Sequence, residues 1–388
     1  MTTRVFALAF AAEPGRGSEP GAGAEFARAL AAVSRRDDCI VRLYTRSHRL
    51  GKLRAALDAD VPGHRLEVVP VAIWAPLARR LQWQWARLSY VWWQRRATSR
   101  VQADLRDVPA KDRVVVHHVT FATVAVPTFE RRIRRPDGSS PTFVFGPAGS
   151  SSMELPDNPG LRVRGIQLMR TAVGRYNLAG VDLAVAQTLD LVPVFLRLGA
   201  KNALACPNVV VDPPAGIEEV IRNPKRIINV GLLIPRKRQE LALQAFALLE
   251  DRDLRMAIVG SGPLEDDLRR RCHELGLGPR VDFLGKLTPE DTLREIARSA
   301  VLLHTSRNEG ATWVIAEAQT VGTVPVAPPR TGADSTIHLG GAGVVARDDS
   351  PQALADAVTE ALRRPGTTTD MWRRERLPEL LTQWYGLA

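Results

Sequence analysis

Strands and helices alternate along the second half of the chain, and this alternation constrains the fold more than any other sequence feature. Five short apolar runs are typical of buried strands: residues 226–230, 254–259, 281–284, 301–304 and 323–327. Segments with helical spacing lie between them, and the connecting turns are short and often contain glycine. Such alternation predicts a parallel sheet with helices on both faces, because each parallel pair of strands needs a crossover connection.

Two helix starts in this half are marked by a hydroxyl residue followed by proline, at Thr288-Pro289 and Ser350-Pro351. The hydroxyl can cap the first turn, and proline suits the first helical position because no N–H is needed there. Together with the apolar spacing, these signals predict helices that include 239–249, 264–275, 312–321 and 352–363.

The first half repeats the pattern less regularly, so the chain is expected to hold two α/β domains. A chain of 388 residues is long for a single hydrophobic core. The linker composition of Asp212 to Gly216 predicts a first domain at 1–213 and a second at 214–365. The tail 366–388 contains Trp372 and Trp384 and is expected to be a docked helix. Expected elements of the first half are a helix at 24–33 and strands at 5–10, 40–45, 66–71, 114–119, 143–145 and 183–186.

Composition narrows the class of protein further. Apolar residues make up 45% and charged residues 24%, which is ordinary for a globular protein, and no run approaches about 20 uncharged apolar residues. The three cysteines, Cys39, Cys206 and Cys272, are odd in number and widely spaced, which predicts a reducing, cytoplasmic compartment. The net charge of +11 comes from scattered arginines without a basic, aromatic stripe, so nucleic acid is not an expected partner.

Residues 76–96 differ from the rest of the first half because tryptophan and arginine are concentrated there. Leu77, Leu81, Trp85, Leu88 and Trp92 fall on one face of a helix. We favour a core helix with solvated arginines. The alternative is a helix that binds an acceptor or lies on the surface of an anionic membrane, in which case the protein would be peripheral at the inner membrane face.

The strongest functional signal is the stretch 309–317, where a loop turns into a helix after the strand 301–304. Glu309 and Glu317 stand eight residues apart, and Gly310 between them lets the backbone approach a ligand. The N–H groups of Ala311 and Thr312 are expected to be unpaired at the helix start, where they can bind an anion. This arrangement suits a ligand with a phosphate in its middle and hydroxyl groups at both ends, such as a nucleotide-sugar.

A second signal follows the first strand of the same domain. Arg236 and Lys237 come after Gly231 and just before a helix, where cations can neutralise a diphosphate and stabilise its departure. Gly260 and Gly262 follow the strand 254–259 and mark a position where the backbone is expected to come close to a ligand or to another segment. The full dinucleotide-binding glycine motif is missing.

The first domain offers weaker candidates. His117 and His118 close a predicted strand, and adjacent strand residues point to opposite faces, so at most one is expected to face a ligand. The glycine-rich loop 15–23, with Gly21 and Gly23, is either an anion-binding nest or a flexible loop. Three pairs of adjacent aspartates lack the context of a metal site, so no metal is expected.

Taken together, these motifs resemble the retaining glycosyltransferases of family four, which have the GT-B fold. The resemblance rests on Gly231 with 235–237, on 259–263, on 281–285, and on 309–317 followed by Gly322. It implies two Rossmann-like domains facing across a cleft, with a C-terminal helix crossing back to the first domain. It further implies no essential metal or cofactor.

The resemblance also implies roles for individual residues. Lys237 and Arg236 would hold the donor diphosphate, Glu317 the ribose, and Glu309 the sugar near the reacting carbon. One first-domain histidine, His117 by preference, would contact the sugar and help to orient the acceptor. The remaining implied donor contacts are backbone or flanking positions: Gly21, Gly23, Gly231, Gly260, Gly262, Lys286, Leu287, Gly310, Ala311 and Thr312.

The expected activity is therefore transfer of a hexose from a nucleotide-diphosphate sugar to a hydroxyl of a glycan, lipid or small metabolite. Two departures from the family pattern are visible: Leu232 stands where arginine is common, and 310–312 replaces a common Phe-Gly. A nucleotide-sugar epimerase or phosphorylase of the same fold stays open as an alternative. So does a catalytically silent protein that binds a membrane surface through 76–96.

Overall fold

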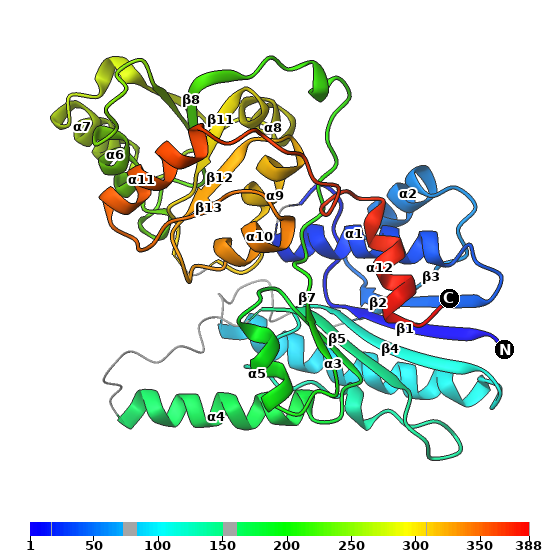
Figure 1. Cartoon of the computed structure of the whole chain (residues 1–388). Coiled ribbons are helices and arrows are strands. Elements are labelled where there is room, and N and C mark those ends of the chain that lie inside the picture. Colours follow the sequence, from blue (N-terminus) through cyan, green and yellow to red (C-terminus); the bar gives the residue numbers. More distant parts are fainter. Residues whose placement is uncertain (17, 73–83, 150–160, 308, 388) are drawn as a thin grey trace. The chain divides into compact units, whose positions relative to one another are not determined.

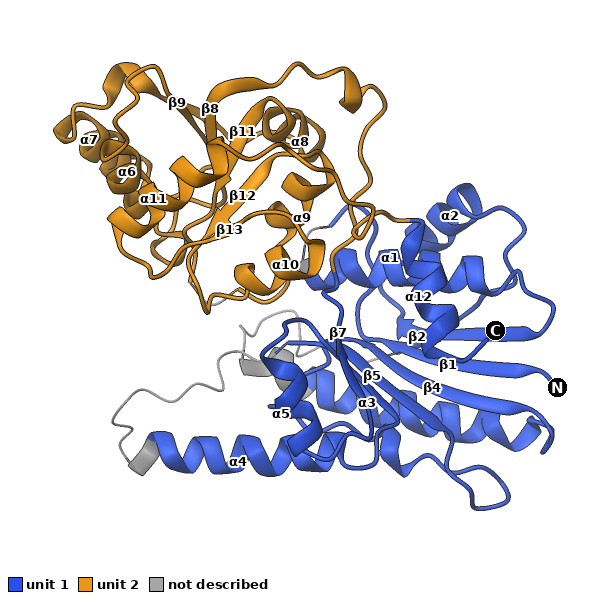
Figure 2. Ribbon diagram, in the orientation of Figure 1, with its two compact units in different colours: residues 1–208, 375–388 blue, residues 209–374 orange. Residues whose placement is uncertain are grey.

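The computed structural model describes residues 1–388 except 17, 73–83, 150–160, 308 and 388. For residues 18, 84–88, 161 and 162 it describes the backbone but not the side chains. The chain forms two compact units, which Figure 2 shows in different colours. Unit 1 comprises residues 1–208 and 375–388, and unit 2 comprises residues 209–374. The sequence-based division between 213 and 214 lies five residues after the first of these boundaries (213 − 208).

Unit 1 is built on a seven-stranded parallel sheet with the strand order β3-β2-β1-β4-β5-β6-β7 (Figure 1). The order reverses between β1 and β4, as it does in doubly wound α/β folds. The strands are β1 (Thr3–Ala9), β2 (Cys39–Arg46), β3 (Glu67–Val71), β4 (Arg113–Thr120), β5 (Thr142–Ala148), β6 (Leu183–Ala186) and β7 (Ala203–Ala205).

Helices cover both faces of this sheet. One face is covered by α3 (Gln84–Asp104), α5 (Leu191–Arg197) and the carboxyl end of α4 (Leu161–Leu178), whose apolar residues share one core cluster with the strands. On the other face α1 (Ser18–Val33) packs against α2 (Leu50–Asp60) and against α12 (Arg376–Trp384). The last segment of the chain therefore belongs to the same unit as the first.

Unit 2 holds a six-stranded parallel sheet with the order β10-β9-β8-β11-β12-β13. Its strands are β8 (Asn223–Val230), β9 (Arg255–Val259), β10 (Val281–Gly285), β11 (Ser299–Leu303), β12 (Val324–Ala327) and β13 (Val344–Val345). Its helices are α6 (Gln239–Ala247), α7 (Glu265–Glu274), α8 (Pro289–Ala297), α9 (Trp313–Thr320), α10 (Ala333–Gly340) and α11 (Pro351–Leu362). Two apolar clusters, one on each face of the sheet, form its core. Both units thus have the Rossmann-like architecture that the sequence predicted.

The two proline-marked helix starts are confirmed in detail. Thr288 Oγ1 accepts a hydrogen bond from the N–H of Asp291 at 3.1 Å, and Ser350 Oγ accepts one from the N–H of Ala353 at 3.2 Å. Each hydroxyl therefore satisfies one of the N–H groups that the first helical turn leaves unpaired.

Several expectations for unit 1 need correction. Helix α1 begins at Ser18, six residues before the expected start at 24 (24 − 18), so Gly21 and Gly23 are helical residues. Helices α2, α4 and α5 lack a predicted counterpart. In α3 the buried stripe is Tyr90, Trp93, Ala97 and Val101, whereas Trp92, which was placed on the expected core face, is exposed. The other members of that expected face, Leu77, Leu81, Trp85 and Leu88, lie outside the described side chains.

Candidate functional site

Lys237 and Glu309 meet beyond the carboxyl ends of the two central strands of unit 2. Lys237 ends a short 3-10 helix, Pro235–Lys237, after β8, and Glu309 follows β11. The Lys237 ammonium lies 2.7 Å from Glu309 Oε1, and the Arg236 guanidinium lies 2.8 Å from the same oxygen. Residues 72 positions apart in the sequence are thus brought together at the sheet edge where open α/β folds bind their ligands.

Hydrogen bonds between the two loops hold this pair in place. Thr305 Oγ1 donates to the Lys237 carbonyl at 2.9 Å, and the N–H of Arg307 donates to the Arg236 carbonyl at 3.1 Å. On the other side of the loop, the N–H of Glu309 donates to the carbonyl of Thr331 at 2.7 Å. The backbone of Glu309 is therefore fixed between two loops, and its carboxylate lies beside the two cations in the absence of a ligand.

Glu309 is strongly acidic in this setting. Burial opposes its ionisation, but the Lys237 charge and the hydrogen bonds from Lys237 and Ser306 outweigh burial and lower its pKa to about 2. The carboxylate is therefore ionised at neutral pH, and it partly neutralises the two cations beside it. An anionic ligand must compete with Glu309 for those cations.

Helix α9 begins between the two glutamates and leaves its first N–H groups unpaired. Within the described residues, the N–H groups of Gly310, Ala311 and Thr312 form no backbone hydrogen bond. Thr312 is buried, and its Oγ1 has no hydrogen-bond partner among the described residues. A helix start with free donors and a nearby cation is a physical basis for binding phosphate.

Glu317 lies in the second turn of α9 and contrasts with Glu309. It is partly buried, and no described residue forms a hydrogen bond or ion pair with its carboxylate. Burial raises the pKa of Glu317 to about 7. A carboxylate that has lost water without gaining a donor is suited to accept hydrogen bonds from ligand hydroxyls.

The glycines of the neighbouring loops pack against backbone. A Cβ on Gly260 would lie 1.9 Å from the carbonyl oxygen of Gly231, and one on Gly262 would lie 2.4 Å from that of Leu233. The close approach that the sequence indicated for Gly260 and Gly262 is therefore made to the loop after β8. Gly231, at the start of the same loop, lies beside the Lys237 side chain, since a Cβ on Gly231 would be 3.4 Å from Lys237 Cδ.

The remaining predicted positions of unit 2 lie around this edge. Lys286 and Leu287 follow β10, the edge strand of the sheet; Lys286 is exposed, and Leu287 packs partly buried against the core. Leu232, which replaces a common arginine, is 59% exposed and supplies no cation.

In unit 1 the two histidines lie inside β4, on opposite sides of the sheet as strand geometry requires. His117 is fully buried, and its Nε2–H donates to the carbonyl of Gly146 at 2.7 Å. Its Nδ1 lies 2.7 Å from the hydroxyl of Tyr385 in the C-terminal segment. Burial lowers the pKa of His117 to about 3, so its imidazole is neutral. His117 thus links β4 to the C-terminal segment of the chain.

His118 is equally enclosed on the α3 side. Its Nδ1–H donates to Glu130 Oε1 at 2.6 Å, and its Nε2 lies 2.9 Å from the Tyr90 hydroxyl. Burial opposes ionisation of Glu130, but the charge and hydrogen bond of His118 outweigh it and lower the Glu130 pKa. Both histidines that the sequence nominated as catalytic are therefore core residues with their ring nitrogens engaged.

Gly21 and Gly23 also serve packing in this structure. A Cβ on Gly21 would lie 1.9 Å from the carbonyl oxygen of Arg16, and one on Gly23 would lie 1.9 Å from that of Ala11. Within the predicted anion nest at 15–23, these two α-carbons therefore lie against the chain's own backbone.

Sequence reasoning missed Glu19, which gathers three segments at the carboxyl edge of the first sheet. Its carboxylate accepts hydrogen bonds from the N–H of Phe121 at 3.2 Å, from Gln187 at 3.3 Å and from Asn208 at 3.2 Å. Burial raises the pKa of Glu19 despite these bonds. The available signal was a carboxylate inside the glycine-rich loop after the first strand.

Two further groups were also missed. Glu13 is contacted by Arg49 at 3.0 Å, by Arg46 at 3.4 Å and by Arg16 at 3.5 Å, so three cations gather around one carboxylate near the ends of β1 and β2. In unit 2, His304 follows β11 and is buried, and its Nε2 has no partner among the described residues. Burial and the nearby Lys237 charge lower the pKa of His304 to about 4.

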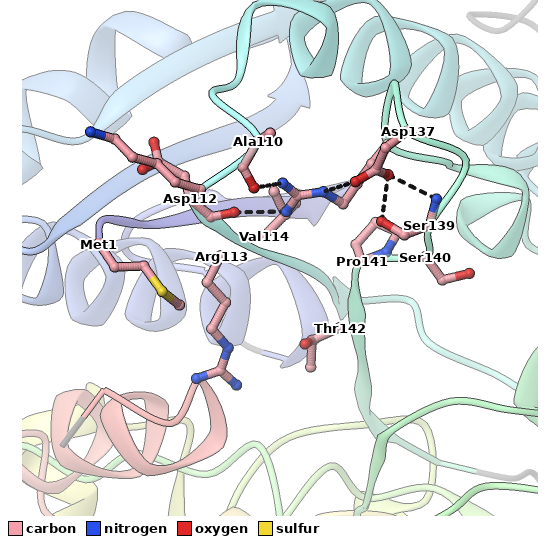
Figure 3. Close-up of a pocket in the computed structure, with 12 residues that line it drawn as sticks. Met1, Ala110, Asp112, Arg113, Val114, Asp137, Ser139, Ser140, Pro141 and Thr142 are labelled. Carbon is pink, nitrogen blue, oxygen red and sulfur yellow. Dashed lines mark hydrogen bonds and ion pairs between the residues drawn. The ribbon is translucent and has the colours of Figure 1, made fainter.

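A cavity of about 330 Å³ lies at the opposite edge of the first sheet. Figure 3 shows the residues that line it. The cavity is lined by Met1, by Arg113 at the start of β4, and by Thr142 at the start of β5. It therefore lies at the amino ends of the strands, away from the edge where Glu19 and Phe121 meet.

None of the helices within the described residues is long and apolar enough to cross a membrane. Outside the gaps at 73–83 and 150–160, and the three single masked positions, there is no group of three or more metal-ligating His, Cys, Asp or Glu side chains.

Comparison with known proteins agrees with the geometry of unit 2. Residues 215–377 match the family model described as glycosyl transferases group 1. D-inositol 3-phosphate glycosyltransferase of Corynebacterium glutamicum is 33% identical over 146 residues, which are 36% of this chain and 35% of that protein. Alpha-D-kanosaminyltransferase of Streptomyces kanamyceticus is 30% identical over 155 residues, 39% of each chain. The matches thus span little more than a third of each relative's length.

Solved structures match along the whole chain at low identity. HepE of Anabaena in complex with UDP aligns over 100% of both chains with a TM-score of 0.57 and 17% identity. Sucrose-phosphate synthase of Thermosynechococcus elongatus covers 99% of this chain and 98% of its own, with a TM-score of 0.63 and 16% identity. These likenesses show the fold. The chain therefore has the GT-B fold, with two Rossmann-like units, and its residues 215–377 are similar to glycosyl transferases group 1.

Proposed function

We propose that this protein is a hexosyltransferase-type glycosyltransferase that moves a sugar from a nucleotide-diphosphate sugar to an acceptor hydroxyl with retained anomeric configuration. The observation that carries the proposal is the meeting of Lys237 and Arg236 with Glu309 beside the free amino end of α9. The relatives' names support it, since they include inositol-phosphate glycosyl- and kanosaminyltransferases. One structural neighbour was solved with UDP and glucose.

Each group at this edge has a defined task in the proposed reaction. Lys237, Arg236 and the N–H groups of 310–312 bind the diphosphate and stabilise the charge that it gains on leaving. Glu317 accepts hydrogen bonds from the ribose hydroxyls. Glu309 turns from the cations toward the sugar once phosphate has taken its place beside Lys237.

The chemical step needs no protein nucleophile in this proposal. The bond between the anomeric carbon and the phosphate oxygen breaks, and the acceptor oxygen forms a bond to the same carbon from the same face. The acceptor proton passes to the departing phosphate, so atoms and charge balance. Buried His117 and His118 are not required as bases, which agrees with their engaged ring nitrogens.

The test begins with a thermal-shift screen of nucleotide-sugars, because a ligand that binds the folded state raises the unfolding temperature. A stabilising donor is then incubated with candidate acceptors, and the anomeric configuration of the product is read by NMR. Stabilisation by a donor, followed by a product of retained configuration, supports the proposal. Inverted product, or donor isomerisation without an acceptor, contradicts it.

A further inference from the structure

Helix α4 of unit 1 presents its apolar side chains to solvent. Leu168 is 72% exposed and Met169 is 60% exposed, and Ala172 one turn later is exposed as well. Spacings of three and four residues place these side chains on one stripe of the helix. The opposite side packs on the unit only at the carboxyl end of the helix, through Asn177 and Leu178, because Val163 and Ile166 are 39% and 41% exposed. Leu168, Met169 and Ala172 therefore form an apolar stripe that faces away from the sheet.

Helix α3 adds a tryptophan on the same side of the sheet. Trp93 is fully buried, whereas its neighbour Trp92 is 67% exposed and turns away from the core. Both helices contribute to the single apolar cluster on this face of the sheet, so their outward stripes point away from the same layer. Figure 1 shows α3 and α4 together at the lower border of unit 1.

The short 3-10 helix Glu130–Arg132 joins these two outward stripes. Phe129 is flanked by Arg95 of α3 at 5.7 Å and by Arg132 at 5.3 Å. Arg132 also donates to the Tyr176 hydroxyl of α4 at 3.2 Å, and Arg131 donates to the Tyr176 carbonyl at 2.5 Å. We call the resulting surface the α3–α4 face; its members are Trp92, Arg95, Arg132, Arg164, Leu168, Met169, Ala172 and Arg175.

The charge of this face is positive. The sequence of α4 contains four arginines and no acidic residue, and the sequence of α3 contains four arginines and one acidic residue, Asp104. Asp104 faces inward, where it accepts a hydrogen bond from Tyr44 at 2.6 Å. Arg164 and Arg175 are exposed beside the apolar stripe of α4. Neither of these two helices therefore brings an exposed acidic side chain to the surface where Leu168, Met169 and Trp92 lie among arginines.

We infer that the α3–α4 face docks on the surface of a membrane leaflet that contains anionic lipids. Arginine-flanked apolar stripes lie in the interfacial region of such leaflets, where apolar burial and attraction to lipid phosphate add together, and tryptophan favours the same depth. A second copy of the chain is a poorer occupant, because two copies of this face would bring like charges together. The inference is independent of the proposed transfer reaction, since its test measures binding alone.

The test is co-sedimentation of the full chain with vesicles. Vesicles of phosphatidylcholine alone are compared with vesicles that mix phosphatidylcholine and phosphatidylglycerol, at low and high salt. We expect binding to the anionic vesicles that weakens as salt screens the arginines. The paired substitutions Leu168→Ser and Met169→Ser should weaken that binding at least about tenfold, because two apolar anchors are lost.

Matched controls come from unit 2, which contributes no residue to this face. Ile221 is 89% exposed, so Ile221→Ser removes an equally accessible apolar side chain. For charge, Arg164→Glu with Arg175→Glu is compared with Arg252→Glu and Arg255→Glu, which are exposed arginines of unit 2. Only the α3–α4 variants should release the protein from anionic vesicles.

Three results would overturn the inference. The first is no binding of the full chain to anionic vesicles, and the second is equal binding by the α3–α4 variants and their controls. The third is that the α3–α4 variants lose a dimer in size-exclusion chromatography but bind vesicles as well as the native chain does. Circular dichroism of each variant checks that the fold is kept. If the serine pair fails to fold, the charge-reversal pair and the salt dependence still decide between these results.

Discussion

The ends of β8 and β11 in unit 2 and the interior of β4 in unit 1 handle their polar residues in opposite ways. Lys237 and Glu309 lie in loops after their strands, and both keep part of their side chain in solvent. His117 and His118 lie within β4, before its last residue Thr120, and both are buried under helices. In these two regions, the histidines within the covered strand are part of the core, whereas Lys237 and Glu309 past the strand ends stay accessible to a ligand.

The comparison also separates two kinds of hydrogen bonding. The His118–Glu130 contact satisfies groups that would otherwise be stranded in the core, so it serves stability. The Lys237–Glu309 contact holds groups that an incoming diphosphate can rearrange. Substitutions in the first region should therefore act on folding, and substitutions in the second should act on ligands.

The largest effect is expected for Glu130→Ala. This change leaves His118 without its carboxylate partner in the core and should lower the free energy of unfolding by about 3–5 kcal/mol. Chemical denaturation measures the loss, with Glu67→Ala of the exposed Arg42–Glu67 pair as control, where less than about 1 kcal/mol is expected. Activity per folded molecule should change little. A large loss of turnover at unchanged stability would reverse the roles assigned to the two regions.

The next effect is that of Lys237→Ala on transfer. Removing the cation that faces the leaving diphosphate should lower kcat/KM by about 10²- to 10³-fold, while the unfolding temperature stays close to that of the native chain. Lys225→Ala, in the exposed pair with Asp251 of the same unit, is the matched control and should keep full activity. Near-native turnover of the Lys237 variant would remove the basis of the proposed site.

Sequence patterns predicted the second region better than the first for a physical reason. The strand-to-helix turns of unit 2 carry short-range signals, such as the Thr288-Pro289 start and the glycine after β8, and these signals determine local geometry. The position of a residue relative to the last paired residue of its strand depends on the partner strand and on covering helices. The sequence of 114–119 does not contain that information, because Tyr90, Glu130 and Tyr385, which enclose the two histidines, lie on other elements of the chain.

Glycine illustrates the same limit in both units. The sequence marked Gly260 and Gly262 as positions of close approach and Gly21 and Gly23 as part of an anion nest or a flexible loop, and at all four the nearest group is the chain's own backbone. A missing Cβ predicts proximity but does not say to what. The amphipathic stripe of α3 was misassigned for a related reason, since either of two adjacent tryptophans could have faced the core, and only the packed sheet selects Trp93.

Glu317→Ala is expected to have a smaller, more selective effect. Loss of the carboxylate that is proposed to bind the ribose should weaken nucleotide binding about 10- to 150-fold, since hydrogen bonds to a charged group contribute about 1.5–3 kcal/mol. Calorimetry with the nucleoside diphosphate measures this, and Glu290→Ala at the exposed start of α8 is the control. Unchanged nucleotide affinity would exclude Glu317 from the donor site and leave Lys237 as the main determinant.

The smallest effect sharpens the contrast between the two glutamates of unit 2 in the ligand-free protein. Glu317 has a folded pKa of about 7, above its ordinary value of 4.5, so the folded state holds a proton that the unfolded state releases. Its contribution to stability is complete below the unfolded pKa and is lost as pH rises through about 7. Glu309 has a folded pKa of about 2, so its contribution is present above its ordinary value and is lost as pH falls toward 2.

Substitution by glutamine should therefore shift the two stability profiles in opposite directions. Glu317→Gln should raise the unfolding temperature at about pH 8 and leave it nearly unchanged at about pH 4. Glu309→Gln should lower it at neutral pH, by an amount that shrinks as the solution approaches about pH 3. Thermal melts of both variants across this range give the comparison directly. Parallel profiles would show that the two carboxylates have similar environments. That result would contradict the different roles proposed for Glu309 and Glu317.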